Sequence, residues 1–113
     1  MIGDVLKAVR IANYMTLREA SEKANVSVSY LADLEKNWHN PSNRELEKIC
    51  LAYNLDVPEL LKLDKYHETI IKKIGLKEEL LINRLLLREI LNLYVAKEQQ
   101  KTKVNTLSKY NKL

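Results

Sequence analysis

Three side chains that could recognise the edge of a DNA base fall on one face of a helix predicted at residues 28–36. They are Val28, Ser29 and Asp33, while the leucines of this segment point inward. A serine hydroxyl can bond a base or a phosphate, a valine can contact the methyl group of thymine, and a carboxylate can accept from cytosine N4. The pattern predicts that these three residues read bases in the major groove of double-stranded DNA.

The same three residues also have structural interpretations, which the sequence leaves open. Ser29 could serve only to start the helix, and Val28 could be a passive exposed residue. Asp33 could pair with Lys36 or Lys23, because a carboxylate on a DNA-facing surface also repels phosphates.

A second set of polar side chains is suited to phosphate oxygens. Several of its members fall in the first turns of predicted helices, where free backbone amides and the helix dipole favour anions. An exposed arginine anywhere would look similar, so a general surface role remains the alternative. The predicted phosphate contacts are Thr16, Arg18, Tyr30, Asn37, His39, Asn43 and Arg44. Trp38, beside them, is interpreted as a packing residue rather than a DNA contact.

Helix-start and helix-stop signals position these side chains. Thr16 and Ser42 each precede a glutamate by three residues, which is the capping-box pattern of a helix start. Asn25 and Asn37 lie where helices should stop, because asparagine tolerates the left-handed conformation. With the apolar spacing, these signals predict five short helices, at residues 2–13, 17–24, 28–36, 42–53 and 57–63. The second and third form a helix-turn-helix unit, whose second helix offers its N-terminal side chains to the major groove.

The chain changes character after residue 63. A short helix is predicted at 65–74 and a longer one from Lys77 to Gln100, with Gly75 between them. The longer helix is apolar around most of its circumference, so it must be buried on more than one side. Its main apolar stripe supplies the predicted oligomerisation residues, which are Leu80, Leu87, Ile90, Leu91 and Tyr94. The alternative is that this helix packs on the N-terminal helices of its own chain.

We therefore expect an all-α chain of 113 residues in three parts. Residues 1–63 form a helix-turn-helix DNA-binding domain, and residues 65–100 form a two-helix oligomerisation segment. Residues 101–113 form a basic tail that frays, and that either adds non-specific affinity for DNA or is simply solvated.

Charge and composition narrow the functional classes. The net charge is +4, but residues 1–63 carry eight Lys and Arg against nine Asp and Glu, so any electrostatic footprint is a local patch or the tail. The single cysteine, Cys50, is expected in the core and excludes an intrachain disulfide, which fits the cytoplasm. We expect neither a signal peptide nor a membrane span.

Enzymatic and metal chemistry are not indicated. His39 and His67 have no partners at ligand spacing. Nothing resembles a nucleophile–base pair, a glycine-rich phosphate loop or a catalytic carboxylate pair. We expect no catalytic residue, no metal and no cofactor.

Several short motifs recur at fixed spacing along the first half of the chain. Glu22-Lys23-Ala24-Asn25-Val26-Ser27 spans the predicted turn, and Ser29-Tyr30-Leu31, Leu34-Glu35-Lys36, Asn40-Pro41-Ser42 and Leu55-Asp56-Val57 follow it. With this spacing, the stretch from Leu6 to Leu61 resembles the Cro/cI-like (XRE-type) helix-turn-helix family of bacterial and phage repressors. The resemblance implies the five-helix fold and double-stranded DNA as partner. Arg10 and Glu35 resemble a structural ion pair that ties the first helix to the third, with independent surface roles as the alternative.

The start Met1-Ile2-Gly3, Leu17 and Leu46-Glu47-Lys48 resemble more closely the family's regulators of biofilm formation and sporulation in spore-forming Gram-positive bacteria. This resemblance implies a dimer or tetramer formed through the C-terminal helices, and a small homologous antagonist that disrupts it. Val28 and Asp33 depart from the long polar readers of many relatives, and the loop at 37–40 is one residue shorter. The operator sequence therefore does not carry over.

These observations favour a sequence-specific transcriptional repressor that acts as an oligomer. The alternative is an antitoxin or antagonist whose primary role is to bind another protein. A stable homo-oligomer of the chain alone would favour the repressor, whereas aggregation relieved by a second protein would favour the antagonist.

Overall fold

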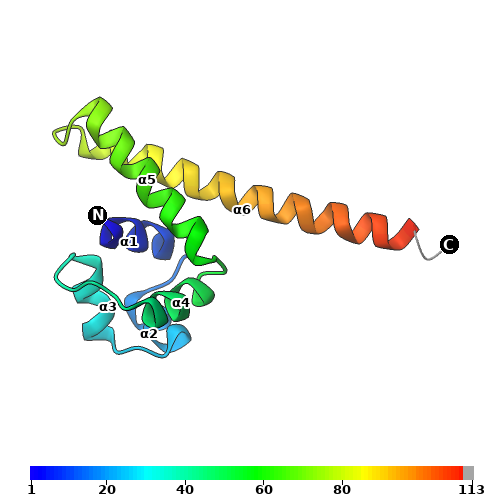
Figure 1. The fold of residues 1–113 in the computed structure, drawn as a ribbon, viewed down its shortest axis with the longest axis horizontal. Coiled ribbons are helices and arrows are strands. Elements are labelled where there is room, and N and C mark those ends of the chain that lie inside the picture. Colours follow the sequence, from blue (N-terminus) through cyan, green and yellow to red (C-terminus); the bar gives the residue numbers. More distant parts are fainter. Residues whose placement is uncertain (111–113) are drawn as a thin grey trace.

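The described part of the chain is helical throughout. The computed structural model describes residues 1–110, and side chains for residues 1–101. Six helices lie in this part: α1 (Ile2–Ala12), α2 (Leu17–Ala24), α3 (Val28–Glu35), α4 (Asn43–Ala52), α5 (Val57–Ile74) and α6 (Glu79–Tyr110). The predicted all-α class is confirmed (Figure 1).

The short helices begin and end at the residues that carry the local signals. The hydroxyls of Thr16 and Ser42 accept from the backbone of Glu19 and Glu45, and each glutamate reaches back to complete a capping box. Asn25 ends α2 with φ of 55°, in the left-handed region that asparagine tolerates. These local bonds satisfy amides and carbonyls that a helix end would otherwise leave unpaired.

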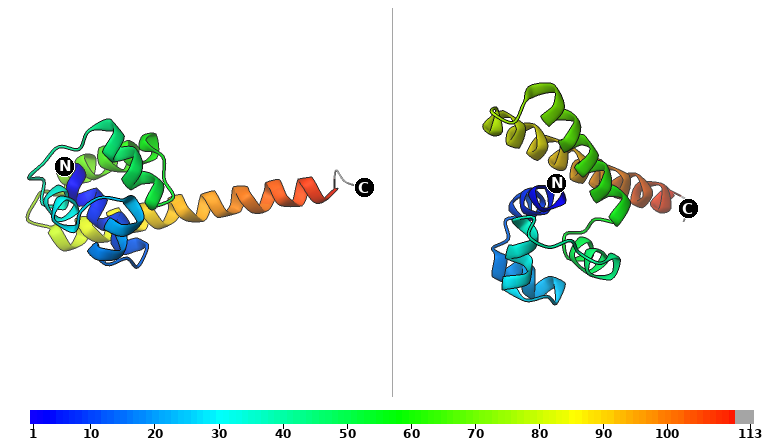
Figure 2. Two further views of the ribbon diagram at one scale, coloured as in Figure 1. Left: turned by 90° about the horizontal axis from the view of Figure 1, so that it is seen from below. Right: turned by 60° about the vertical axis from the view of Figure 1, so that its left-hand side comes forward.

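Helix α1 lies at the centre of the fold. Val5, Leu6 and Val9 are fully buried, and α1 packs against α3, α5 and α6. In Figures 1 and 2, α2, α3 and α4 lie on one side of α1, and the pair α5–α6 lies on the other. The face that carries α3 is therefore turned away from α6.

The C-terminal helices are longer than the sequence predicted. Helix α5 is continuous from Val57 to Ile74, where we expected one helix to end at 63 and another to begin at 65. Leu63, His67 and Ile70 are all buried at helical spacing, so a break at this point would interrupt one packed face. Helix α6 continues to Tyr110 rather than ending near Gln100, and residues 111–113 of the predicted tail lie outside the described residues.

Helix α6 packs on its own chain. Ile82, Leu86 and Ile90 are buried, and Leu86 and Ile90 belong to the same core as α1 and α3. The buried face is therefore centred on Ile82, Leu86 and Ile90 rather than on the stripe through Leu80 and Leu87. Beyond this contact, the second half of α6 projects from the rest of the molecule (Figure 1). None of the helices in residues 1–110 has the length and apolarity needed to cross a membrane.

Candidate nucleic-acid interface

Helices α2 and α3 form a helix-turn-helix with a short, internally bonded turn. The amide of Val26 donates to the carbonyl of Ser21 at 3.0 Å. Ser27 caps α3, because its hydroxyl accepts from the amide of Tyr30 at 3.1 Å. Leu31 and Leu34 are buried, which fixes α3 against the core and leaves one face of it outside.

The three predicted base readers lie on or beside that outer face. Val28 and Ser29 are exposed in the first turn of α3, and Asp33 is partly exposed one turn later. Ser29 and Asp33, four residues apart, lie on the same side of α3, whereas Val28 immediately precedes Ser29 and points about 100° away around the helix axis.

An ion pair joins α3 to α1. Arg10 Nε donates to Glu35 Oε2 at 2.7 Å, and Arg10 Nη2 donates to Glu35 Oε1 at 3.0 Å. Both side chains are largely buried, and the hydrogen bond to Glu35 raises the pKa of the Arg10 guanidinium. A bidentate pair of this kind fixes orientation as well as distance, so it sets how α3 leaves the core.

A second contact fixes the other end of α3. The amide of Gly3 donates to Asn37 Oδ1 at 2.8 Å. A Cβ at position 3 would lie 2.2 Å from the carbonyl oxygen of Leu34, so only glycine allows this approach. The side-chain oxygen of Asn37, a predicted phosphate contact, is thus bonded to α1, and its Nδ2 lies 3.5 Å from Asp4.

The loop between α3 and α4 folds back onto α3. The ring of His39 stacks on that of Tyr30, with centroids 6.3 Å apart and planes 20° from parallel. His39 Nε2 lies 3.5 Å from Asp33 Oδ2. Asp33 therefore has a neighbour that the sequence did not indicate, since we considered only Lys36 and Lys23 as partners. Lys36 instead lies over the exposed ring of Trp38, with its Nζ 4.5 Å from the ring centroid.

Tyr30 is also bonded to α4. Its hydroxyl donates to Glu45 Oε2, the same carboxylate that completes the capping box with Ser42. This bond lowers the pKa of Glu45, while burial and the bond together raise the pKa of Tyr30 to about 12. Tyr30 therefore contacts the His39 ring and is also bonded to Glu45, which ties α3 to the start of α4.

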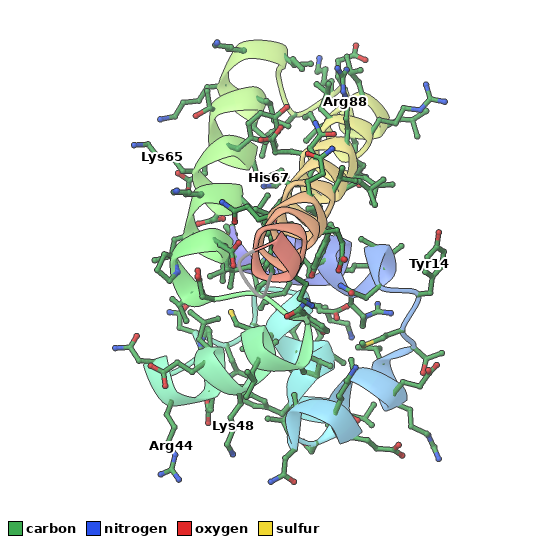
Figure 3. All side chains as sticks on the ribbon, turned by 90° about the vertical axis from the view of Figure 1, so that its right-hand side faces the viewer. Tyr14, Arg44, Lys48, Lys65, His67 and Arg88 are labelled. Atoms are coloured by element: carbon green, nitrogen blue, oxygen red, sulfur yellow. The ribbon has the colours of Figure 1, made fainter. Side chains whose placement is uncertain are left out.

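Exposed polar and cationic side chains lie at the starts of α2 and α4. Arg18 and Arg44 are exposed in the first turns of α2 and α4, as is Asn43, and Thr16 lies exposed at the cap of α2. Figure 3 shows Arg44 and Lys48 extending from α4 away from the body of the protein. Lys48 was missed by the sequence analysis, although its i+4 spacing from Arg44 places both on one side of α4.

Among the described side chains, those of residues 1–101, no three His, Cys, Asp or Glu gather as possible metal ligands. Burial raises the pKa of the Cys50 thiol to about 11, which keeps it protonated and unreactive.

The predicted oligomerisation residues are divided between the core and the surface. Ile90 is 0% exposed, and the Tyr94 hydroxyl donates to the carbonyl of Tyr53. Leu80 and Leu91 are exposed, and Leu91 has 46% of its surface accessible. Leu87 lines a groove between α1 and α6.

The same groove reveals apolar residues that the sequence analysis did not single out. Ile11 of α1 lines it together with Leu87 and is half exposed. Leu91 and Val95 continue from Leu87 at four-residue intervals along α6 and are also exposed. Spacing along α6 could have suggested Val95, but only the fold brings Ile11 into the groove beside Leu87. We call Ile11, Leu87, Leu91 and Val95 the α1–α6 apolar face.

Comparisons with known proteins agree with this geometry. A protein-family model described as helix-turn-helix matches residues 6–60. The chain is 41% identical over 70 residues to the HTH-type transcriptional regulator SinR of Bacillus subtilis. The matched segment covers 61% of this chain and 61% of SinR. It is 38% identical over 72 residues to the immunity repressor protein of Bacillus phage phi105, covering 64% of this chain and 47% of that protein. The chain thus spans about half to three fifths of the length of these curated relatives.

Among solved structures, a chain in a complex of SinR protein and SinI protein is similar over most of its length. Its TM-score is 0.56 at 30% sequence identity, and the match covers 90% of this chain and 99% of that one. SinR is the kind of regulator that the sequence was expected to resemble, and that resemblance is confirmed.

Proposed function

Because the chain belongs to the helix-turn-helix family, of the Cro/cI-like type, we propose that it is a sequence-specific DNA-binding transcriptional regulator that acts as a repressor. The observation that carries the proposal is the presentation of α3. The Arg10–Glu35 pair and the Gly3–Asn37 contact hold this helix, while its N-terminal turn projects Val28 and Ser29 outward. A recognition helix must be rigid at its base and open at its N-terminal turn.

The proposal divides the surface into base readers and phosphate contacts. Val28, Ser29 and Asp33 read bases. Thr16, Arg18, Asn43 and Arg44 contact phosphates, and Lys48 joins them, whereas Tyr30, Asn37 and His39, which we expected among these contacts, are engaged by Glu45, Gly3 and Asp33. Base contacts set which sequence is chosen, and phosphate contacts set affinity for all sequences.

Binding isotherms with single substitutions test this division. Ser29→Ala should change the preferred sequence, whereas Arg44→Ala should weaken binding to every duplex and reduce the salt slope by about 0.9. Arg88→Ala is the matched control, because Figure 3 places Arg88 at the opposite end of the molecule from Arg44. Equal effects of Arg44→Ala and Arg88→Ala would contradict the proposed interface.

We further propose that the repressor is an oligomer formed through the α1–α6 apolar face. Leu87, Leu91 and Val95 are partly exposed and follow one another along α6, with Ile11 beside Leu87, which is the composition expected at the centre of a protein interface rather than on free surface. Two linked reading domains would bind two half-sites, and such linkage raises affinity by about 10² to 10⁴. Leu80 and the outer side of α6 would extend this contact.

Sedimentation of a surface variant tests the oligomer. Leu91→Glu should give a folded monomer, because Leu91 is exposed in the single chain and the substitution leaves the core intact. A wild-type chain that sediments as a monomer at tens of micromolar would refute the proposal.

The similarity to a chain of the SinR–SinI complex supports a further part of the proposal, that a small homologous protein competes for α6 and dissociates the oligomer. The same apolar face would also suit an antitoxin or antagonist, which is the second candidate function. The two are distinguished by purifying the chain alone: a soluble homo-oligomer supports the repressor, and aggregation that only a second protein relieves supports the antagonist.

A further inference from the structure

Asp33 presents an electrostatic difficulty for a DNA-binding surface. It lies on the reading face of α3, with 33% of its side chain exposed. A carboxylate in this position is repelled by the phosphates on either side of the major groove, yet it is also the group suited to accept from cytosine N4. A cation nearby would offset this charge and favour the reading of cytosine there.

The structure places one group where it can do this. His39 Nε2 lies 3.5 Å from Asp33 Oδ2, and 58% of the His39 side chain is exposed. Imidazole is the side chain type whose charge can change between pH 5 and 8.

His39 is held beside Asp33 by the loop and helix around it. Its ring stacks on Tyr30, and the hydroxyl of Tyr30 is bonded to Glu45 at the start of α4. Because Glu45 is itself bonded within the capping box of α4, the Tyr30 ring on which the imidazole stacks is fixed in position. An exposed ion pair normally contributes little, since ordering two mobile side chains is costly in entropy. The stacking on Tyr30 lowers that entropic cost for His39.

The charged and titratable groups around His39 come from two helices. Asp33 and Tyr30 face it from α3, and Glu45 lies behind Tyr30 on α4. Lys36, the nearest lysine along α3, lies over Trp38. The phosphates of bound DNA favour a cationic side chain at this position.

We propose that His39 is a specificity-determining residue that acts through Asp33. Protonated His39 pairs with Asp33 Oδ2, offsets its charge and leaves the other carboxylate oxygen to accept from a base amino group, with cytosine N4 as the expected partner. This inference rests on the proposed function of α3 as a reading helix. It adds that recognition at the Asp33 position strengthens as the pH falls.

The sign follows from linkage. If the complex contains protonated His39 and the free protein is partly deprotonated, binding takes up a proton. The logarithm of the association constant then rises by up to about 1 for each unit that the pH falls through the titration of the histidine. At pH values above this titration, the association constant no longer changes with pH.

The test uses the full chain and its best duplex from a random pool, with affinity measured from pH 5.5 to 8 at constant ionic strength. The wild type should bind about five-fold or more tightly at the acidic end, consistent with one good base contact. His39→Gln should remove this pH dependence and weaken the preference for cytosine at one position. His39→Arg, which keeps a cation, should retain the preference without the pH dependence.

Two further variants separate charge from structure. The chain has two histidines, and His67 lies between α5 and α6 away from α3, so His67→Gln should keep the wild-type slope. Asp33→Ala should abolish both slope and preference, and adding His39→Gln to it should cost nothing more.

The outcomes distinguish this inference from the proposed function. A wild-type chain with no preference over random DNA refutes the proposed function, and this inference with it. A wild-type chain that binds specifically, but keeps its pH slope and cytosine preference in His39→Gln, refutes this inference alone.

Discussion

Replacing Ile90 with alanine tests the packing of α6 on the helix-turn-helix domain. Ile90 is 0% exposed and belongs to the core that α1 and α3 share. The change removes three carbon atoms, which at about 0.8 kcal/mol for each buried group amounts to about 2.4 kcal/mol. The cavity left behind adds to this, and measured Ile→Ala changes in cores cost about 2–5 kcal/mol.

The matched control is the next residue on the same helix. Leu91 is 46% exposed, so Leu91→Ala removes an apolar group of equal size from the surface and should cost well under half as much. Alanine improves helix propensity more when it replaces isoleucine than when it replaces leucine, so propensity slightly reduces the expected difference and cannot be its source.

Thermal and urea unfolding followed by circular dichroism measure both variants. A loss of about 3 kcal/mol should lower the Tm by about 10–20 °C, and the loss should appear in a single transition because α6 shares the core. Equal small shifts for the two variants, or a separate transition for α6, would refute the packing described above. The experiment should be run at low protein concentration, so that association does not contribute to stability.

Three further substitutions test contacts that hold the reading helix and α6. Gly3→Ala should destabilise the fold by about 1–3 kcal/mol, because its Cβ would lie 2.2 Å from the Leu34 carbonyl oxygen, and unfolding in urea measures this. Arg10→Gln should cost about 3–5 kcal/mol by leaving the buried Glu35 carboxylate without its cation, and the loss should be smaller at a pH low enough to protonate Glu35. Tyr94→Phe should cost about 0.5–1.5 kcal/mol through the lost hydrogen bond to the backbone, and an unchanged Tm would show that the bond contributes nothing.

The parts of the fold that the sequence predicts well are those set by local chemistry. The boundaries of α2 and α4 follow from Thr16 and Ser42, because a capping hydroxyl acts on an amide three residues away. The left-handed Asn25 is equally local. The placement of Val28 and Ser29 on an outer face then follows from helix geometry once α3 is located.

The parts that the sequence does not predict depend on which surfaces meet. Helix α6 is apolar around most of its circumference, so spacing cannot decide whether the face through Leu80 and Leu87 or the one through Ile82 and Leu86 is buried. The position of α1 decides it, and α1 is distant in sequence. Similarly, no breaker separates the two segments that form α5, and the change in composition near residue 63 was mistaken for the end of a helix.

The sequence also does not predict the contact between His39 and Asp33. It depends on the path of the loop between α3 and α4, where His39 also stacks on Tyr30. Loop conformation of this kind is set by tertiary contacts, so residue types alone indicate only that a histidine is nearby.

Selection of bound duplexes from a random pool tests most directly the central claim, that α3 reads DNA sequence. The full chain should enrich a defined sequence with half-sites in a two-fold arrangement, and Ser29→Ala should enrich a different sequence at the same spacing. Competition at physiological salt should then show at least about a thousand-fold preference over random DNA. If the wild-type chain enriches no sequence, or if Ser29→Ala and Asp33→Ala enrich the same sequence as the wild type, α3 is not the reading helix.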